Sequence, residues 1–212
     1  MIYKILKRSI DIVGAIFLLI FFSPVILITA LLIKLTTHGP IFANTPKRVG
    51  KSNRAFFPYK FRSMIVNAHE LLKTDPRFKN LHKEYTKSGY KLYNDPRVTP
   101  VGRFIRKHSI DEIPQLLNVL KGEMSIVGPR PYYPEELGQQ FRKFPEKKKL
   151  LKNVLSVKPG ITGYWQVSGR SSVDFDKRIE LDAYYAGKKS LFLDLLILLK
   201  TPWAMISGKN TV

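Results

Sequence analysis

The sequence contains no cysteine, which excludes both a disulfide framework and a thiolate metal site. Acidic residues are scarce: 16 Asp and Glu stand against 36 Lys and Arg, and the formal net charge is +20. Such an excess favours an anionic partner, namely nucleic acid, an anionic membrane or a phosphorylated substrate. The 212 residues are enough for one domain with a hydrophobic core.

Charge is absent altogether from residues 12–33, IVGAIFLLIFFSPVILITALLI. A helix of this length is about 30 Å long, roughly the hydrocarbon thickness of a bilayer. A buried core helix of this size usually keeps a polar face. A cleaved signal peptide has a shorter apolar run that ends in a small-residue cleavage site. Neither alternative fits, and we predict that this segment holds the chain in a membrane.

The apolar segment is interrupted at its centre by Ser23 and Pro24. Proline removes a backbone hydrogen bond and predicts a break, and the serine hydroxyl can bond a freed carbonyl. Both flanks of the segment are basic, and no acidic residue occurs between positions 11 and 70. Because basic flanks stay on the cytoplasmic side, we predict that residues 1–36 enter and leave the membrane on one face. Residues 37–212 would then form a domain on the membrane surface.

The rest of the chain predicts a mostly helical domain with little sheet. Helices are expected over 109–121, 134–144 and 176–186, and extended or turn-like backbone over 127–134. The first of these helices begins with Ser109 and Glu112 at capping-box spacing and ends at Gly122, a favourable C-cap. Residues 190–206 leave two alternatives open, a helix lying in the headgroup plane or an ordinary core helix.

Several nucleotide- and metal-binding motifs are missing. The sequence has no G-x-G-x-x-G, G-x-S-x-G or H-E-x-x-H pattern, so the chemistry that these motifs carry is set aside. The histidines show no ligand spacing, and we predict surface or loop positions for all of them: His38, His69, His82 and His108.

The main candidate for chemistry is the acidic pair Asp111 and Glu112 in a basic neighbourhood. Nearby arginines and a helix N-terminus both favour the ionised form of a carboxylate. Two adjacent carboxylates can divide the work of attacking phosphorus or carbon and of holding Mg²⁺. Spacing alone, however, favours a helix-capping pair without chemistry. Arg130, between two prolines, fits either a structural salt bridge or a phosphate contact.

Three segments occur in a characteristic order: KFRSM at 60–64, GRFIRKHSIDEIPQLLNVLKGEMSIVGPRP at 102–131 and KPGITGYWQVSGR at 158–170. With them the chain resembles, over essentially its whole length, the bacterial sugar transferase family, the monotopic polyprenyl-phosphate phosphoglycosyl transferases. This family has a re-entrant membrane helix broken at a Ser-Pro pair, which matches Ser23 and Pro24. Larger members carry extra spanning helices in front, and we expect this chain to be similar to the minimal catalytic unit.

The resemblance implies a role for the aspartate of the pair. Asp111 would attack the sugar-bearing phosphate of a UDP-sugar, release UMP and keep a phosphosugar, which polyprenyl phosphate then accepts. Glu112 would bind Mg²⁺ together with Asp111. Matching family positions imply phosphate binding by Arg106, Arg130 and Arg170. Lys60 and Arg62 are expected to face the same site.

The implied partners are a UDP-sugar donor, undecaprenyl phosphate and membrane lipids, with no nucleic acid. The implied place is the cytoplasmic face of the bacterial inner membrane, at the first step of exopolysaccharide, lipopolysaccharide or capsule synthesis. Homo-oligomers remain an open alternative, and the sequence does not identify the sugar. Two competing hypotheses are a membrane-tethered protein that binds nucleic acid or anionic lipid, and a transferase that uses a single direct displacement.

Overall fold

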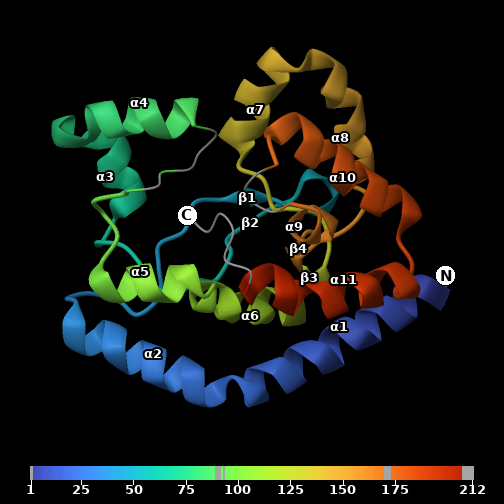
Figure 1. Ribbon diagram of the computed structural model, residues 1–212, viewed down its shortest axis with the longest axis horizontal. Helices are drawn as coiled ribbons and strands as arrows, with labels where there is room; N and C mark the ends of the chain where they lie inside the picture. Colours follow the sequence, from blue (N-terminus) through green and yellow to red (C-terminus); the bar gives the residue numbers. More distant parts are fainter. Residues whose placement is uncertain (1, 89–91, 93, 170–172, 207–212) are drawn as a thin grey trace.

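The computed structural model describes residues 2–88, 92, 94–169 and 173–206. Helices dominate these residues, and the strands form two small two-stranded sheets (Figure 1). The prediction of a mostly helical chain with little sheet is confirmed.

The α-helices are α1 (Ile2–Phe21), α2 (Ser23–Thr36), α3 (Ala68–Thr74), α4 (Lys79–Lys87), α5 (Pro100–Lys107), α6 (Leu116–Lys121), α7 (Pro134–Lys143), α8 (Lys148–Val154), α9 (Tyr164–Val167), α10 (Phe175–Lys188) and α11 (Leu191–Ile206). Short 3-10 helices are η1 (Lys51–Asn53), η2 (Pro76–Phe78), η3 (Ile110–Gln115) and η4 (Pro145–Lys147). The strands are β1 (Arg48–Val49), which pairs antiparallel with β2 (Ala55–Phe56), and β3 (Ser125–Val127), which pairs parallel with β4 (Gly160–Thr162).

The predicted break divides the N-terminal apolar segment into α1 and α2, which meet at an angle of 59°. Pro24 has no N–H to give to the carbonyl of Ile20, and the Ser23 hydroxyl donates to that carbonyl instead at 2.7 Å. Among the described helices, none alone is long and apolar enough to cross a membrane. Taken together, α1 and α2 have the length and the apolar composition to do so.

Two further helix predictions hold: α10 covers the expected range, and α7 covers its range except for Phe144, which is the C-cap. The segment 109–121 is different: it begins as the 3-10 helix η3 and becomes α-helical only in α6. Pro114 lies inside η3, and Ser109 adopts a left-handed backbone with φ of 55° and makes no side-chain capping bond. The predicted capping box is therefore wrong. The C-cap is confirmed, since Gly122 has φ of 82°.

Among the described residues, three apolar clusters hold the elements together. The first lies between α1, α6 and β3, around Ala15, Val119 and Met124. The second packs α7 and α8 on α10. The third is small and joins α2 to α5 through Ile33, Phe61 and Ile105. As a result α1 and α2 lie along one side of the molecule, beneath α5, α6 and α11 in the view of Figure 1.

The helix α11 is apolar on both faces but buries only one of them. Asp194 and Ile197 are buried, while Phe192, Leu199 and Trp203 are 71%, 69% and 76% exposed. Lys7 of α1 lies 3.4 Å from the Asp194 carboxylate, which places α11 beside the N-terminal helix. One face of α11 thus packs in the core and the other is exposed, so residues 190–206 share a feature of each of the two alternatives.

Candidate active site

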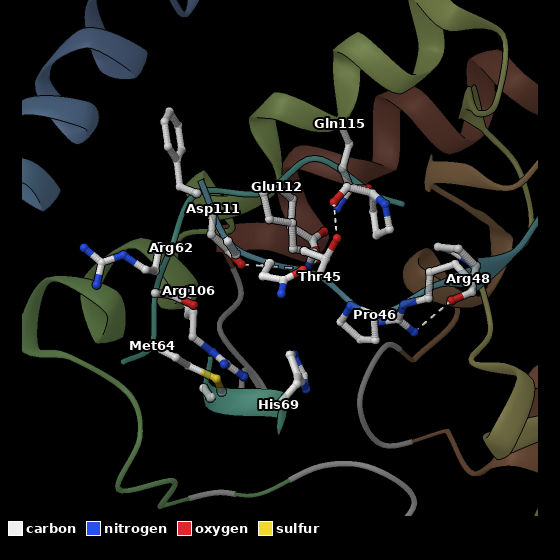
Figure 2. A pocket seen from close by; sticks show the side chains of 18 of the residues that line it. Thr45, Pro46, Arg48, Arg62, Met64, His69, Arg106, Asp111, Glu112 and Gln115 are labelled. Carbon is white, nitrogen blue, oxygen red and sulfur yellow. Dashed lines mark hydrogen bonds and ion pairs between the residues drawn. The ribbon is translucent and has the colours of Figure 1, made fainter. Parts of the chain in front are cut away.

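A cavity of about 330 Å³ lies between the segment around Lys60, η3, α3 and the loop after β3 (Figure 2). Cationic side chains outnumber carboxylates on its wall. The cations are Arg48, Lys60, Arg62, Arg97, Arg106 and Arg130, and the carboxylates are Asp95, Asp111 and Glu112. The charge balance suits an anionic ligand.

Lys60 joins the two candidate carboxylates. Its Nζ donates to Glu112 Oε1 at 2.5 Å and lies 3.8 Å from Asp111 Oδ2. The backbone fixes this geometry, because the Phe61 N–H donates to the Asp111 carbonyl at 3.0 Å. A strand-like segment and η3, which are 50 residues apart in the chain, thus present their charged side chains to one space.

Burial affects the two carboxyl groups differently. Burial raises the pKa of Asp111 to about 6, against the opposing charges of Lys60 and Arg106. Burial also acts to raise the pKa of Glu112, but the contact with the Lys60 ammonium outweighs it and the pKa is lowered. Glu112 therefore takes the short contact with Lys60 at 2.5 Å, and the Asp111 carboxylate keeps only the longer ion pair to the same ammonium at 3.8 Å.

Arg130 lies on the loop after β3, and this loop packs so closely on β4 that only glycine fits at two nearby positions. Gly128 and Gly160 bring the loop after β3 against β4, and a Cβ on Gly160 would lie 2.1 Å from the Gly128 nitrogen. The Arg130 N–H donates to Asp182 Oδ2 at 3.1 Å, and its guanidinium lies 5.3 Å from the centre of the Trp165 ring. The Asp182 bond fixes the Arg130 backbone, and the Trp165 ring face positions its guanidinium.

Arg130 and Arg106 carry cationic groups that the described protein atoms leave available. The Arg130 Nε is buried and has no hydrogen-bond partner within the described ranges. Arg106, on α5, makes no side-chain hydrogen bond or ion pair to another residue that the structure describes, yet its charge acts on Asp111. A buried donor without a partner on Arg130 and a half-buried guanidinium on Arg106 can both serve a phosphate that arrives with the substrate.

Arg62 has a different environment, although it borders the cavity. Its Nε donates to the Pro40 carbonyl at 2.5 Å, and its Nη2 donates to Thr37 Oγ1 at 2.8 Å. Figure 2 shows the guanidinium turned away from His69 and Arg48. These bonds give no support to the prediction that Arg62 binds substrate.

The remaining predicted residues lie elsewhere. Ser23 and Pro24 form the break between α1 and α2, and Arg170 falls outside the described residues. Of the predicted site, the structure therefore gathers Lys60, Arg106, Asp111, Glu112 and Arg130 around one cavity.

Sequence reasoning missed three residues of this wall. Arg48 stacks on the Tyr133 ring at 3.2 Å and donates to the Pro131 carbonyl at 3.1 Å. His69 was expected on the surface or in a loop, but it lies on α3 and faces the cavity. Burial and the neighbouring arginines lower the pKa of His69 to about 4, so its imidazole is neutral. The Asp95-Pro96-Arg97 turn was the available signal for Arg97.

The carboxylate pair fits Mg²⁺ by its donor chemistry. Hard oxygen ligands suit this ion, which proteins often hold with one or two carboxylates while substrate phosphates and water complete the shell. Asp111 and Glu112 are such a pair on the cavity wall. Within the part of the chain that the structure describes, no group of three or more His, Cys, Asp or Glu side chains could hold a metal.

Comparison with known proteins gives a consistent result. The model of a family described as bacterial sugar transferase matches residues 2–208. An undecaprenyl-phosphate galactose phosphotransferase of Salmonella typhimurium is 44% identical over 198 residues, which cover 93% of this chain and 40% of the relative. The exopolysaccharide production protein ExoY of Rhizobium meliloti is 40% identical over 195 residues, covering 92% of this chain and 83% of that protein.

A third relative, from Aeromonas hydrophila, has the name UDP-N-acetylgalactosamine-undecaprenyl-phosphate N-acetylgalactosaminephosphotransferase. It is 41% identical over 211 residues, which cover 98% of this chain and 45% of the relative. The chain thus spans about two fifths of the length of several curated relatives that it matches, and most of the length of ExoY.

Proposed function

The chain belongs to the bacterial sugar transferase family, and we propose that it transfers a phosphosugar from a UDP-sugar to undecaprenyl phosphate. The names of the relatives support both substrates, since they include undecaprenyl-phosphate galactose phosphotransferase and UDP-galactose-lipid carrier transferase. The product, a sugar linked to undecaprenyl diphosphate, would begin the synthesis of a bacterial surface polysaccharide or glycoconjugate.

One observation carries the proposal: a buried carboxylate that shares its nearest cation, Lys60, with Glu112 lies in one cavity with two further arginines that have donors to spare. Asp111 is the carboxylate, and Arg106 and Arg130 are the arginines. Two anionic substrates need cations that can bind each of them, and a nucleophile that the cations bring close to phosphorus. The same cavity explains part of the chain's positive charge without a nucleic acid partner.

The first half-reaction uses Asp111 as the nucleophile. A carboxylate oxygen of Asp111 forms a bond to the phosphorus that carries the sugar, and the bond from that phosphorus to the bridging oxygen breaks. UMP leaves with the bridging oxygen and its electron pair, and Asp111 retains the phosphosugar as an acyl phosphate. Arg106 and Arg130 offset the charge that develops on the phosphoryl oxygens, and Lys60 keeps Glu112 in place.

The second half-reaction reverses the roles. A phosphate oxygen of undecaprenyl phosphate forms a bond to the same phosphorus, and the bond to Asp111 breaks, which restores the carboxylate. No net proton is needed in either step, because each step exchanges one oxygen nucleophile on phosphorus for another and the leaving oxygen keeps the electron pair of the broken bond. Asp111 and Glu112 would hold Mg²⁺, which supplies positive charge that offsets the diphosphate charge when bound. A covalent relay lets both substrates use the same arginines in turn.

The bent helix pair supports a re-entrant placement in the membrane. Exposed apolar side chains line α1 and α2, with Phe17, Ile20 and Leu27 each more than half exposed, and α11 adds Phe192 and Trp203. An apolar surface of this extent on several elements is typical of a lipid contact. We propose that the pair enters one leaflet from the cytoplasmic face of the bacterial inner membrane, where UDP-sugars are available.

The test is the covalent step. The wild-type chain in detergent or nanodiscs, incubated with Mg²⁺ and a panel of labelled UDP-sugars, should retain label on the protein and release UMP. Asp111→Asn should form no adduct and lose turnover by about 10³-fold or more, because an amide is no nucleophile. Asp174→Asn, an exposed aspartate before α10, is the matched control and should behave as wild type. Full turnover by Asp111→Asn would refute the mechanism, and turnover without an adduct would favour direct displacement.

A further inference from the structure

Arg62 connects the cavity segment to the end of α2. Its side chain is only 6% exposed, and its donors reach the residues that follow the helix. Nε bonds the Pro40 carbonyl at 2.5 Å, and Nη2 bonds Thr37 Oγ1 at 2.8 Å and the Thr37 carbonyl at 3.3 Å. A planar guanidinium that bonds three acceptors on two residues fixes orientation as well as distance.

These acceptors belong to the C-terminal cap of α2. Thr37 is the C-cap residue, and its backbone N–H and its hydroxyl both donate to the Ile33 carbonyl, the hydroxyl at 2.7 Å. The last carbonyls of a helix lack partners within the helix and carry partial negative charge, so a cation there is favourable. Arg62 is thus attached to α2 through Thr37.

The same short segment also touches the candidate nucleophile. Lys60 binds Glu112, and the next residue, Phe61, donates its N–H to the Asp111 carbonyl at 3.0 Å. The Arg62 N–H in turn donates to the Ile41 carbonyl at 2.8 Å, on the chain that leaves α2. Three consecutive residues therefore link the carboxylate pair to the end of the membrane element.

The apolar contact between α2 and α5 does not set this position by itself. Ile33, Phe61 and Ile105 are buried together there, but apolar burial is non-directional. It favours contact without fixing how far one helix has moved along the other. The directional bonds across this junction are those of Arg62 and its neighbouring backbone.

We propose that Arg62 is a positioning residue that sets the place of Asp111 relative to α2, and through α2 relative to the lipid. The inference rests on the proposed function, because it separates the two half-reactions. A UDP-sugar arrives from water and can follow the cavity wherever it sits. The phosphate of a lipid-borne acceptor is held near one depth, and a misplacement of about 1 Å can lower a rate 10²-fold. Arg62 is therefore needed for the acceptor step and dispensable for the donor step.

The first experiment compares Arg62→Lys with Arg103→Lys in the full chain in nanodiscs. Lysine keeps the charge at position 62 but replaces the planar fork, which reaches Pro40 from Nε and Thr37 from Nη2, with a single nitrogen on a flexible stem. Arg103 lies on the exposed face of α5 and serves as the control for the same chemical change. For Arg62→Lys we expect adduct yield from the donor alone within about twofold of wild type, and acceptor turnover about 10- to 100-fold lower. Arg103→Lys should leave both unchanged.

A second pair of variants breaks the contact from the other side and leaves Arg62 in place. Thr37→Val removes the hydroxyl that accepts from Arg62, whereas Thr36→Val removes a neighbouring hydroxyl that bonds only within α2, to the Leu32 carbonyl at 2.6 Å. Thr37→Val should also lower acceptor turnover, but its fold reduction should be only about one third to one tenth of the reduction in Arg62→Lys. Thr36→Val should match wild type. This pair also covers the case in which Arg62→Lys fails to fold.

The results separate this proposal from the proposed function. If wild type forms adduct and Arg62→Lys loses both half-reactions equally, Arg62 acts on a shared substrate phosphate and the positioning role is refuted. Unchanged acceptor turnover in Arg62→Lys and Thr37→Val also refutes it. A water-soluble short-chain polyprenyl phosphate should restore the turnover of Arg62→Lys relative to wild type, because that acceptor is not held at one depth.

A measurement that needs no catalysis tests the same link if wild type forms no adduct. The chain has no cysteine, so spin labels at Leu35→Cys on α2 and Lys107→Cys on α5 report one distance. Arg62→Lys and Thr37→Val should broaden the distribution of this distance, and Thr36→Val should not. An unchanged distribution in both test variants would overturn the proposal.

Discussion

The two halves of the N-terminal helix pair are attached to the rest of the molecule by different physical means. On α1, Arg8 donates to the carbonyls of Val119 at 2.6 Å and Leu120 at 2.8 Å, near the end of α6. Asp11 accepts from the Ile126 N–H at 3.0 Å, in β3. A half-buried arginine and a buried aspartate of α1 thus complete the hydrogen bonding of the backbone in two elements of the domain.

The attachment of α2 is mainly apolar. Ile33 packs with Phe61 and Ile105, and the directional contact comes from the other side, where Arg62 bonds Thr37. At α2 the charged side chain, Arg62, lies on the domain and binds the helix end. At α1 the charged side chains lie on the helix and bind the domain.

This difference indicates different consequences of mutation. The bonds of α1 lead to α6 and β3, which lie directly after the carboxylate pair and directly before Arg130. Their loss leaves buried groups without partners and lowers the stability of the whole domain. The bonds at the end of α2 join it to the segment that contains Lys60 and contacts Asp111, and they do not complete the core of the domain. Their loss should therefore displace the site and leave the domain folded.

The most severe test of α1 is Asp11→Ala. Asp11 is 2% exposed and its Oδ1 accepts from the Ser125 hydroxyl, the Ile126 N–H and Lys7. Removal leaves the Ser125 and Ile126 donors unpaired in the interior and leaves Lys7 with Asp194 alone, and we expect a loss of about 3–5 kcal/mol in the free energy of unfolding. Denaturant unfolding in nanodiscs measures it, with Lys4→Ala on the exposed face of α1 as the control. A loss under about 1 kcal/mol would mean that α1 is held by apolar contact, as α2 is.

A second buried carboxylate binds the segment that follows β3, and no described lysine forms an ion pair with it. Asp182 accepts from the Arg130 N–H at 3.1 Å and the Tyr132 hydroxyl at 2.7 Å, and its Oδ1 has no partner among the described residues. Burial raises the pKa of Asp182 to about 7. The folded state therefore holds this proton more tightly than the unfolded state does from about pH 4 to pH 7. Its contribution to stability is complete below that range and is lost as the pH rises through 7.

The expected change is about 2–4 kcal/mol over that range for the wild-type chain, and Asp182→Asn should abolish this component of the pH dependence. Unfolding free energies at pH 5, 6, 7 and 8 measure it. Asp176→Asn, on the same helix and partly exposed, is the matched control. Equal pH profiles for wild type and Asp182→Asn would show that Asp182 is ionised in the fold, as a paired carboxylate would be.

Arg8 and Arg130 sharpen the comparison because the same residue type has opposite surroundings. Arg8 bonds two carbonyls, and Arg130 has a buried Nε without a partner in the described part of the chain. Arg8→Met should lower the free energy of unfolding by about 1.5–3 kcal/mol. Arg130→Met should leave stability within about 1 kcal/mol, because methionine can still pack against the Trp165 ring, and should lower turnover by about 10²-fold, because the substrate phosphate loses its cation. Unfolding curves and UMP release of both variants measure these effects. A large loss of stability in Arg130→Met, with a loss of turnover alone in Arg8→Met, would mean that the two roles are exchanged.

Local rules predicted much of the helical pattern. The break at Pro24 follows from one missing N–H, and α7 and α10 follow from apolar periodicity. The start of the helix at Ser109 could not be predicted in this way. Its form depends on Lys60, far away in the chain, which binds Glu112 and removes it from any capping box.

The candidate site shows the same limit for arginines. Sequence motifs grouped Arg62 with Arg106 and Arg130, and nothing local distinguishes them. What separates them is whether a backbone carbonyl elsewhere uses the guanidinium, and Pro40 and Thr37 carry no motif that indicates this. Motifs therefore identify the residues that surround a site, whereas contacts distant in sequence decide which of them face the ligand.

The smallest expected effect concerns the break itself. The Ser23 hydroxyl donates to the Ile20 carbonyl at 2.7 Å, a bond worth about 1 kcal/mol. If the two attachments hold α1 and α2 at 59°, Ser23→Ala should barely change the distance between spin labels at Ile5→Cys and Leu35→Cys. Ser9→Ala, at an exposed position of α1, is the control. A large shift in Ser23→Ala alone would mean that the break sets the angle and that Arg62 and Arg8 only follow it. A shift in Arg62→Lys that exceeds the one in Ser23→Ala would place control of the bend in the domain, where the end of α2 meets the residues that lead to Asp111.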